Sequence, residues 1–158
     1  MSSQFIVSTS TFISNDQNLE SGYDFLARNG GNSEPILIEK YEEDKFKASV
    51  KIVPLFSISK PLEKQAALFT NLSFKNNEVC QEFIKEALKL SWEMGFKVAL
   101  ATEYQNEYTK SGFQQVERIF HGYKKQYPLL YFELSWDGIN KISGDIIFPL
   151  NNKPLIIL

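Results

Sequence analysis

The stretch 75–113 constrains the fold most, because it reads in succession as a helix, a strand, a short helix and a turn. Small or apolar residues recur there at steps of three, one, three, one and three, which places them on one stripe of a 3.6-residue helix. Asn76 or Asn77 can cap this helix, and Gly95 can end it. We therefore predict an amphipathic helix over residues 78–94, with a stripe formed by Cys80, Phe83, Ile84, Ala87, Leu88 and Ser91.

A short apolar run, residues 97–102, follows the predicted helix after only two residues. It is too short and too apolar for a surface helix, and it suits a buried strand. Because the connection is so short, the helix and this strand are expected to pack together. Ahead of the helix, residues 66–72 predict a further buried strand.

The first half of the chain is expected to be mostly strand. Residues 5–13 alternate loosely and predict a first strand, and the apolar spacing over 16–29 indicates a short helix. Residues 35–41 and 46–58 predict a hairpin around a charged turn. Pro54 cannot donate to a strand ladder, which places it at a bulge or an edge position. This order of elements favours an α/β fold with a mixed sheet covered by helices.

Composition and charge limit the classes of function. A length of 158 residues suits one domain with a single core, so we expect residues 1–158 to form one domain. The formal net charge of −2 gives no bias toward nucleic acid or an acidic membrane. No apolar run approaches the ~20 residues that span a bilayer, so a cytoplasmic protein without a membrane partner is expected. Cys80 and His121 are the single cysteine and histidine, too few for a disulfide or a zinc site, and we expect no metal.

The helix, the following strand and the segment Tyr108-Thr109-Lys110-Ser111-Gly112-Phe113 resemble the C-terminal half of the GNAT superfamily of acetyl-CoA-dependent N-acetyltransferases. The last helix and turn of that family commonly read Tyr-x-x-x-Gly-Phe. The resemblance covers roughly residues 20–149 and is strongest over 66–134. It implies a single GNAT-like domain in which strands 66–72 and 97–102 are parallel neighbours. These strands are expected to splay apart at their carboxyl ends, where the cofactor of the family enters.

The resemblance also implies a site for the cofactor pyrophosphate at the amino end of the helix, where free N–H groups and the helix dipole favour an anion. In the family this loop reads Gln or Arg-x-x-Gly-x-Gly or Ala, which falls on residues 75–80. Lys75 retains the cation, and Glu78 stands where a glycine is expected. The residues implied in acetyl-CoA binding are Leu72, Lys75, Asn76, Asn77, Glu78, Val79 and Cys80.

Glu78 admits three interpretations. Its carboxylate competes with pyrophosphate for the amides and crowds the approach, or it points away harmlessly, or the register of the motif is shifted. On a free helix, a carboxylate in the first turn is stabilising by about 0.3–1 kcal/mol through the dipole. The position therefore decides between retained and weakened cofactor binding.

Tyr108 matches the family tyrosine that acts as an acid near the departing thiol. A phenol with a pKa near ~10 is protonated at neutral pH and can donate a proton to a thiolate. The alternative is that Tyr108 is only a core aromatic. Glu103 is a candidate general base or a solvated surface residue, and Cys80 on the apolar stripe is expected to pack rather than to act as a nucleophile.

Two functions are consistent with these residues. The first is transfer of an acetyl group from acetyl-CoA to the amine of an unidentified small molecule or protein. The second is a catalytically silent GNAT-fold protein that binds a ligand or a protein partner. No nucleic-acid partner is expected. The apolar segment 154–158 is expected to dock in the chain's own core or against a second copy in a homodimer.

Overall fold

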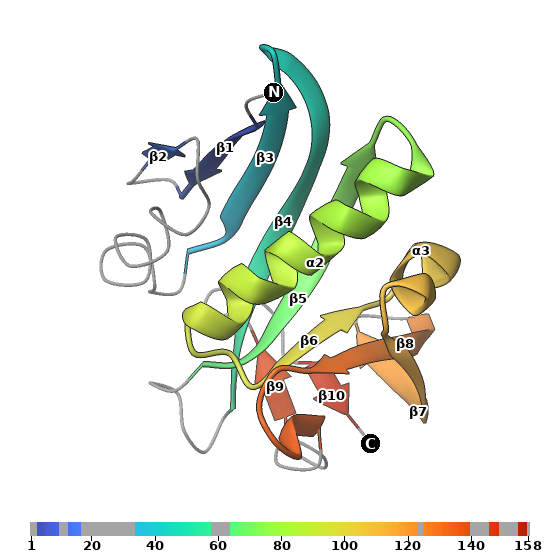
Figure 1. The fold of residues 1–158 in the computed structure, drawn as a ribbon. Coiled ribbons are helices and arrows are strands. Elements are labelled where there is room, and N and C mark those ends of the chain that lie inside the picture. Colours follow the sequence, from blue (N-terminus) through green and yellow to red (C-terminus); the bar gives the residue numbers. More distant parts are fainter. Residues whose placement is uncertain are drawn as a thin grey trace.

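The computed structural model describes residues 3–9, 13–16, 34–57, 64–122, 125–139, 146–148 and 155–157. Within these ranges, one mixed sheet of ten strands carries helix α2 across one face (Figure 1). The elements are β1 (Ser3–Ser8), β2 (Ile13–Asp16), β3 (Ile36–Glu42), β4 (Lys45–Ser57), β5 (Lys64–Phe74), α2 (Asn77–Glu93), β6 (Val98–Ala101), α3 (Gln105–Lys110), β7 (Gln114–Gly122), β8 (Lys125–Glu133), β9 (Ile146–Phe148) and β10 (Leu155–Ile157). This architecture confirms the predicted α/β fold with a mixed sheet.

The strand order is β2-β1-β3-β4-β5-β6-β8-β7-β10-β9, and β9 also pairs with β4. The strands from β4 round to β9 therefore close into a ring, while β1, β2 and β3 extend the sheet beyond it. β5 and β6 pair in parallel, as predicted, and the other described pairs are antiparallel. The connection between the two parallel strands contains α2.

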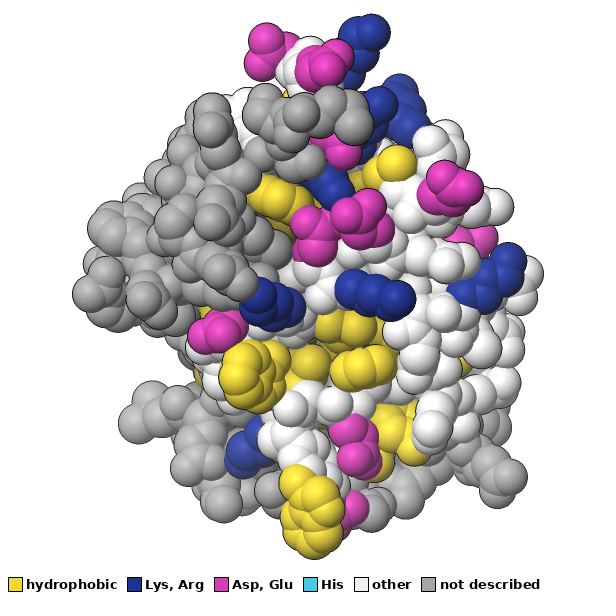
Figure 2. Space-filling view, in the orientation of Figure 1, with side chains coloured by type: hydrophobic (Ala, Val, Ile, Leu, Met, Phe, Trp, Pro, Cys, Tyr) yellow, Lys and Arg dark blue, Asp and Glu magenta, His cyan; other side chains and the backbone are white. Residues whose placement is uncertain are grey.

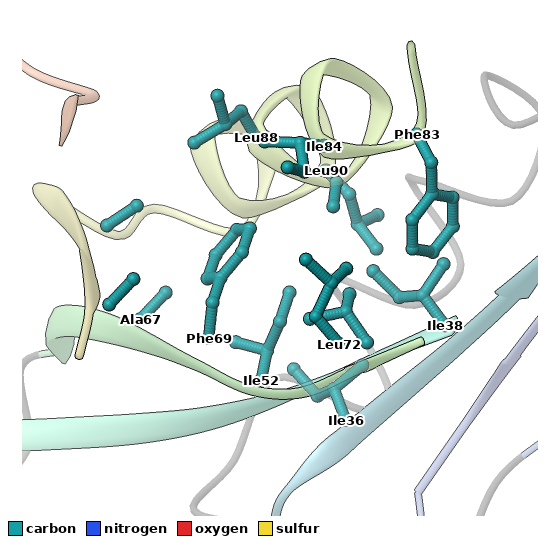
Figure 3. Packing of buried hydrophobic residues seen from close by; sticks show 14 of the residues in the cluster. Ile36, Ile38, Ile52, Ala67, Phe69, Leu72, Phe83, Ile84, Leu88 and Leu90 are labelled. Atoms are coloured by element: carbon teal, nitrogen blue, oxygen red, sulfur yellow. The ribbon is translucent and has the colours of Figure 1, made fainter. Parts of the chain in front are cut away.

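Helix α2 forms where the apolar stripe predicted it. The side chain of Asn76 accepts a hydrogen bond from the Val79 amide at 3.0 Å and caps the helix. At the other end, Gly95 adopts a φ of 91°, which a residue without a Cβ tolerates. Figure 3 shows how the buried stripe packs onto side chains of β3, β4 and β5.

The sheet is buried on both faces around β6, whose four residues are all buried. Ala99 and Ala101 belong to the core under α2, whereas Val98 and Leu100 belong to a second core on the opposite face. This second core includes residues of β4, β5 and β8. Strands with two buried faces read as continuous apolar runs, which explains the sequence of β6.

The hairpin of β3 and β4 confirms another prediction. Its turn residues Glu43 and Asp44 have φ values of 50° and 64°, as in the two-residue turns that match the twist of a hairpin. Pairing with β3 ends at Ile52, so Pro54 has β5 as its neighbour on one side and no β3 residue on the other. Pro54 therefore occupies the edge position that its missing N–H favours.

One buried charge connects β3 to α2. Lys40 follows Ile36 and Ile38 on the inward face of β3 and is only 2% exposed. Its ammonium donates to the carboxylate of Glu86 at 2.9 Å and lies 3.8 Å from that of Glu82. The ammonium also lies 5.5 Å from the centre of the Phe5 ring. These contacts attach α2 to the sheet and compensate the burial of the charge.

The prediction of one strand over residues 5–13 is wrong. β1 ends at Ser8, and a separate strand begins at Ile13 and pairs antiparallel with β1. The serines and threonines of this stretch give no apolar alternation to hold a longer strand on the core, so the chain can reverse. The helix expected over 16–29 lies outside the described residues apart from Asp16, the last residue of β2.

The C-terminal apolar segment contributes strand β10, which pairs with β7 and β9. Its backbone therefore joins the chain's own sheet. In the described part of the chain, neither helix has the length and apolarity to cross a membrane. Acidic and basic side chains are interspersed over the face that carries α2 (Figure 2), so this face has no field of a single sign.

Candidate functional site

The two parallel strands separate at their carboxyl ends. Their pairing runs from Ala66 and Val98 to Phe69 and Ala101. β6 ends there, whereas β5 continues to Phe74 and leads directly into α2. Figure 1 shows the two strands diverging toward the amino end of α2. We call the region between β5 after Phe69 and the chain after Ala101 the split.

A bulge lies in β5 along the split. Ser49 of β4 faces Ser73 and Lys51 faces Thr70, so one residue of β4 opposes both Asn71 and Leu72. Asn71 has a φ of 54°, in the left-handed region. Bulges bend a strand and end its regular pairing. This bulge is a local reason why β5 departs from β6.

The first turn of α2 lies at the end of the split and contains the residues predicted to bind pyrophosphate. The Val79 amide donates to the side chain of Asn76, and the Cys80 amide donates to its carbonyl, each at 3.0 Å. Among the described residues, the amides of Asn77 and Glu78 have no protein acceptor. An anion can therefore reach two free donors here without displacing the cap.

The two charged side chains of this loop are both exposed. The ammonium of Lys75 lies 5.7 Å from the centre of the Phe46 ring. The carboxylate of Glu78 makes no hydrogen bond or ion pair with any described residue. Asn76, not Glu78, occupies the first-turn amide of Val79. Glu78 therefore leaves the two free amides open, although its charge remains nearby.

Tyr108 lies on α3 and is 1% exposed. Its ring packs against Phe69 and Phe113, with ring centres 6.2 Å and 4.8 Å apart. Its hydroxyl has no hydrogen-bond partner among the described residues. Burial, with smaller contributions from Cys80 and Glu103, raises the pKa of Tyr108 far above its ordinary value. The phenol therefore remains protonated and retains a proton that it can donate.

Cys80 is fully buried on the α2 stripe, which confirms that it packs in the core. Burial, and secondarily the charge of Glu107, raises the pKa of its thiol to about 11. A thiol with so high a pKa is a poor nucleophile at neutral pH. Within the described ranges, no three His, Cys, Asp or Glu side chains are grouped so that they could hold a metal ion.

The turn after α3 holds Tyr108 in place. The Phe113 amide donates to the Tyr108 carbonyl at 3.0 Å, and Gly112 has a φ of 106°. A Cβ on Gly112 would lie 3.0 Å from the Phe132 ring, so a glycine is needed there for space as well as for its backbone. Phe113 is buried. The structural roles predicted for Gly112 and Phe113 are confirmed.

An aromatic pair that sequence reasoning missed crosses the split. Phe74 ends β5, and Tyr104 precedes α3. Their ring centres lie 5.8 Å apart in an edge-to-face arrangement. Tyr104 is 43% exposed and has φ and ψ of 52° and 49°, a left-handed conformation that costs a residue other than glycine about 1 kcal/mol. The alternation of Leu72 and Phe74 could have extended the predicted strand to Phe74, but it contains no signal for the contact.

Known structures share this arrangement. No protein-family model and no curated protein matches the sequence. Aminoglycoside 6′-acetyltransferase type Ii is similar with a TM-score of 0.52 and 15% identity, over 82% of this chain and 97% of that chain. A protein from Desulfovibrio desulfuricans, described as an acetyltransferase of the GNAT family, has a TM-score of 0.51 and 12% identity, over 75% of this chain and 79% of that chain. The chain has the GNAT fold.

Within the GNAT fold, the predicted site residues fall into two groups. The first contains Lys75 and residues 76–80, which form the loop and first turn where β5 passes into α2. The second consists of Tyr108, which α3 buries beside the α2 residue Cys80. Leu72 has its side chain in the core under α2, so only its backbone borders the split. Glu103 is exposed, and the side chain of His121 lies outside the described residues.

Proposed function

We propose that this chain is an N-acetyltransferase that transfers an acetyl group from acetyl-CoA to the amine of a small molecule or a protein. The observation that carries the proposal is the buried, unpartnered hydroxyl of Tyr108 in a GNAT fold. A buried hydroxyl without a partner costs about 1–3 kcal/mol, so such groups are rare unless a ligand completes them. The sulfur of an acyl thioester lying in the split is a suitable partner.

The proposal assigns pyrophosphate binding to the start of α2. The free amides of Asn77 and Glu78 and the positive end of the helix dipole favour an anion there. Lys75 adds a charge once its side chain leaves the Phe46 ring. The backbone of Leu72 and the first turn from Asn76 to Cys80 complete the acetyl-CoA site.

In the proposed reaction, the acceptor amine attacks the thioester carbonyl, and a C–N bond replaces the C–S bond. Tyr108 donates its proton to the departing sulfur. The proton lost by the amine nitrogen returns to Tyr108 through water, so the tyrosine is regenerated. Glu103 remains the candidate base for this last transfer. The products are an amide and free CoA.

Cys80 shows why the leaving sulfur needs an acid. Burial raises the pKa of its thiol to about 11, beside the same tyrosine. A thiolate released in this environment is likewise a stronger base than a thiolate in water, because burial disfavours its charge. The environment that holds the proton on Tyr108 therefore also strengthens the group that receives it.

A catalytically silent GNAT-fold protein is the second candidate, and Glu78 is the observation that favours it. A carboxylate in the first turn repels pyrophosphate, and a family glycine is absent there. Calorimetric titration with acetyl-CoA separates the two candidates. The enzyme proposal expects binding by the natural protein, whereas the silent protein binds no acetyl-CoA.

The Glu78→Gly variant sharpens this test. Removal of the nearby charge should tighten acetyl-CoA binding roughly two- to fivefold, as expected for about 0.3–1 kcal/mol of dipole-scale electrostatics. The same change should lower the free energy of unfolding by about 1 kcal/mol, because glycine is a poor helix former. The two measurements have opposite signs, so a folding defect cannot imitate the binding result.

Two control variants complete the experiment. Glu78→Gln removes the charge and keeps the side-chain volume, so it separates repulsion from crowding. Glu93→Gln makes the same change at the exposed far end of α2 and should leave affinity unaltered. An absence of acetyl-CoA binding by the natural protein and both Glu78 variants would reject the enzyme proposal.

A further inference from the structure

The open end of the split is bridged by side chains. The backbones of β5 and β6 part after Phe69 and Ala101, yet the rings of Phe74 and Tyr104 meet beyond that point with centres 5.8 Å apart. Phe74 is partly buried against the core under α2, and Tyr104 is 43% exposed. An extended ligand arm that enters the split from this end therefore meets the ring pair first.

Tyr104 couples this ring pair to Tyr108. Its carbonyl accepts the Tyr108 amide at 3.1 Å, the first hydrogen bond of α3. Its left-handed backbone is unfavourable for any residue with a side chain. The closed arrangement thus places a strained residue and an unpartnered buried hydroxyl four residues apart in one short helix. Both unfavourable features can be relieved together if the ring of Tyr104 moves.

We propose that Phe74 and Tyr104 form an aromatic gate, which closes the split in the unliganded protein and separates to admit the amide-containing arm of an acyl thioester. The inference rests on the proposed acetyl-CoA site and adds the residues that control entry to it. Separation of the rings lets Tyr104 leave its left-handed conformation and lets the thioester sulfur reach the Tyr108 hydroxyl. Relief of these two features offsets the loss of the ring contact, so the gate favours ligands that carry this arm.

The single cysteine provides a reporter that needs no ligand. Cys80 is fully buried in the first turns of α2 and interacts electrostatically with Glu107 and Tyr108 of α3. The rate of its alkylation by iodoacetamide at one fixed pH measures how often this region opens. Tyr104→Gly removes the ring and suits the left-handed backbone, so it should accelerate alkylation at least tenfold. Tyr104→Phe keeps the ring and should alkylate at the natural rate.

A second gate variant guards against an effect on folding. Phe74→Leu retains apolar packing against the core but removes the partner ring, and it should also accelerate alkylation. Each rate is measured beside the urea midpoint of the same protein. Acceleration that follows the loss of stability, and not the loss of a ring, overturns the gate. Equal alkylation rates in the natural protein, Tyr104→Gly and Phe74→Leu overturn it as well.

Ligand binding then tests what the gate admits. Stopped-flow association is measured with acetyl-CoA and with S-acetylpantetheine, which has the arm but no nucleotide. The gate predicts that Tyr104→Gly accelerates association of both ligands by the same factor, and that Tyr104→Phe changes neither. Faster alkylation without binding of either thioester rejects the proposed function and this ligand for the gate. Thioester binding at equal rates in all variants rejects the gate and leaves the proposed function standing.

Discussion

Lys40 and Tyr108 are both buried polar side chains on the α2 side of the sheet, yet only one is satisfied. Lys40 is 2% exposed, and its charge is met by Glu86, by Glu82 and by the face of Phe5. Tyr108 is 1% exposed, and its hydroxyl meets no described partner. The contrast separates a group that holds the fold together from a group that awaits a ligand.

Position in the fold explains the contrast. Lys40 lies on β3, away from the split, where its alternating neighbours all face the core. Tyr108 lies beside the split, where α2 and α3 enclose it. Evolution of a stable core removes unsatisfied groups because they are costly, so a group that remains unsatisfied marks a functional region.

The largest expected effect on stability follows from Lys40→Met. The change keeps most of the side-chain volume but leaves Glu86 without its partner. We expect the free energy of unfolding to fall by about 3 kcal/mol, the lower end for a broken buried pair, because the Glu86 side chain is 24% exposed. Urea denaturation measures the change. Lys45→Met, at an exposed lysine, is the matched control and should stay within about 0.5 kcal/mol.

The Lys40→Met/Glu86→Leu double variant sharpens this result. It removes both charges, so it should recover most of the lost stability. If Lys40→Met costs no more than Lys45→Met, Lys40 is not a structural ion-pair residue and the comparison with Tyr108 fails.

Tyr108→Phe is expected to have a smaller effect on stability and of the opposite sign. Removing a buried hydroxyl without a partner should leave the free energy of unfolding unchanged or raise it by up to about 1 kcal/mol. Tyr131→Phe is the control, because its hydroxyl donates to Gln114 at 2.8 Å and its loss should cost about 0.5 kcal/mol. Equal destabilisation by the two variants would show that the Tyr108 hydroxyl has a partner in the unliganded protein.

The same variant tests the chemistry. Loss of a general acid should lower the acetyl-transfer rate by about 10²-fold or more, while acetyl-CoA affinity stays similar. The pH profile of the rate should also lose the dependence contributed by the phenol. A transfer rate and a pH profile identical to those of the natural protein would remove Tyr108 from the mechanism.

The smallest expected effect is the pH dependence contributed by Glu86. Burial raises its pKa above the ordinary value of 4.5, although Lys40 opposes the shift. The folded protein therefore binds this proton more tightly than the unfolded chain does. The contribution to stability is greatest when the carboxyl is protonated and falls as the pH rises from 4.5 through the raised pKa.

Unfolding measurements from about pH 4 to about pH 7 check this sign. The natural protein should lose stability relative to Glu86→Gln over that window, by less than about 1 kcal/mol. A gain relative to Glu86→Gln over the same window would mean that Lys40 dominates and that the Glu86 pKa is lowered instead.

The sequence predicted those elements that neighbouring residues decide. The stripe of α2, its Asn76 cap and Gly95 lie within one stretch, and the charged turn of the β3–β4 hairpin lies between its own strands. Such local patterns need no knowledge of distant residues. The break between β1 and β2 was missed because weak alternation does not tell a long strand from two short ones.

The remaining features depend on residues far apart in the chain. Lys40 meets Glu86 across 46 positions, and its inward position was concealed because lysine is usually a surface residue. Phe74 meets Tyr104 only because the strands part after Phe69 and Ala101. For the site, the sequence located the loop at 75–80 and the tyrosine at 108. It contained no pattern for the gate or for the missing partner of the Tyr108 hydroxyl.

The pairing of β9 with β4 has a consequence for the order of folding. Phe56 pairs with Phe148, so this contact closes a loop of 148 − 56 = 92 positions, whereas β4, β5, α2 and β6 all lie within residues 45–101. Loop-closure entropy delays such distant contacts relative to local ones. The split can therefore assemble while the ring is still open, and the seam between β4 and β9 forms late. Hydrogen exchange during refolding should protect β5 and β6 before β9.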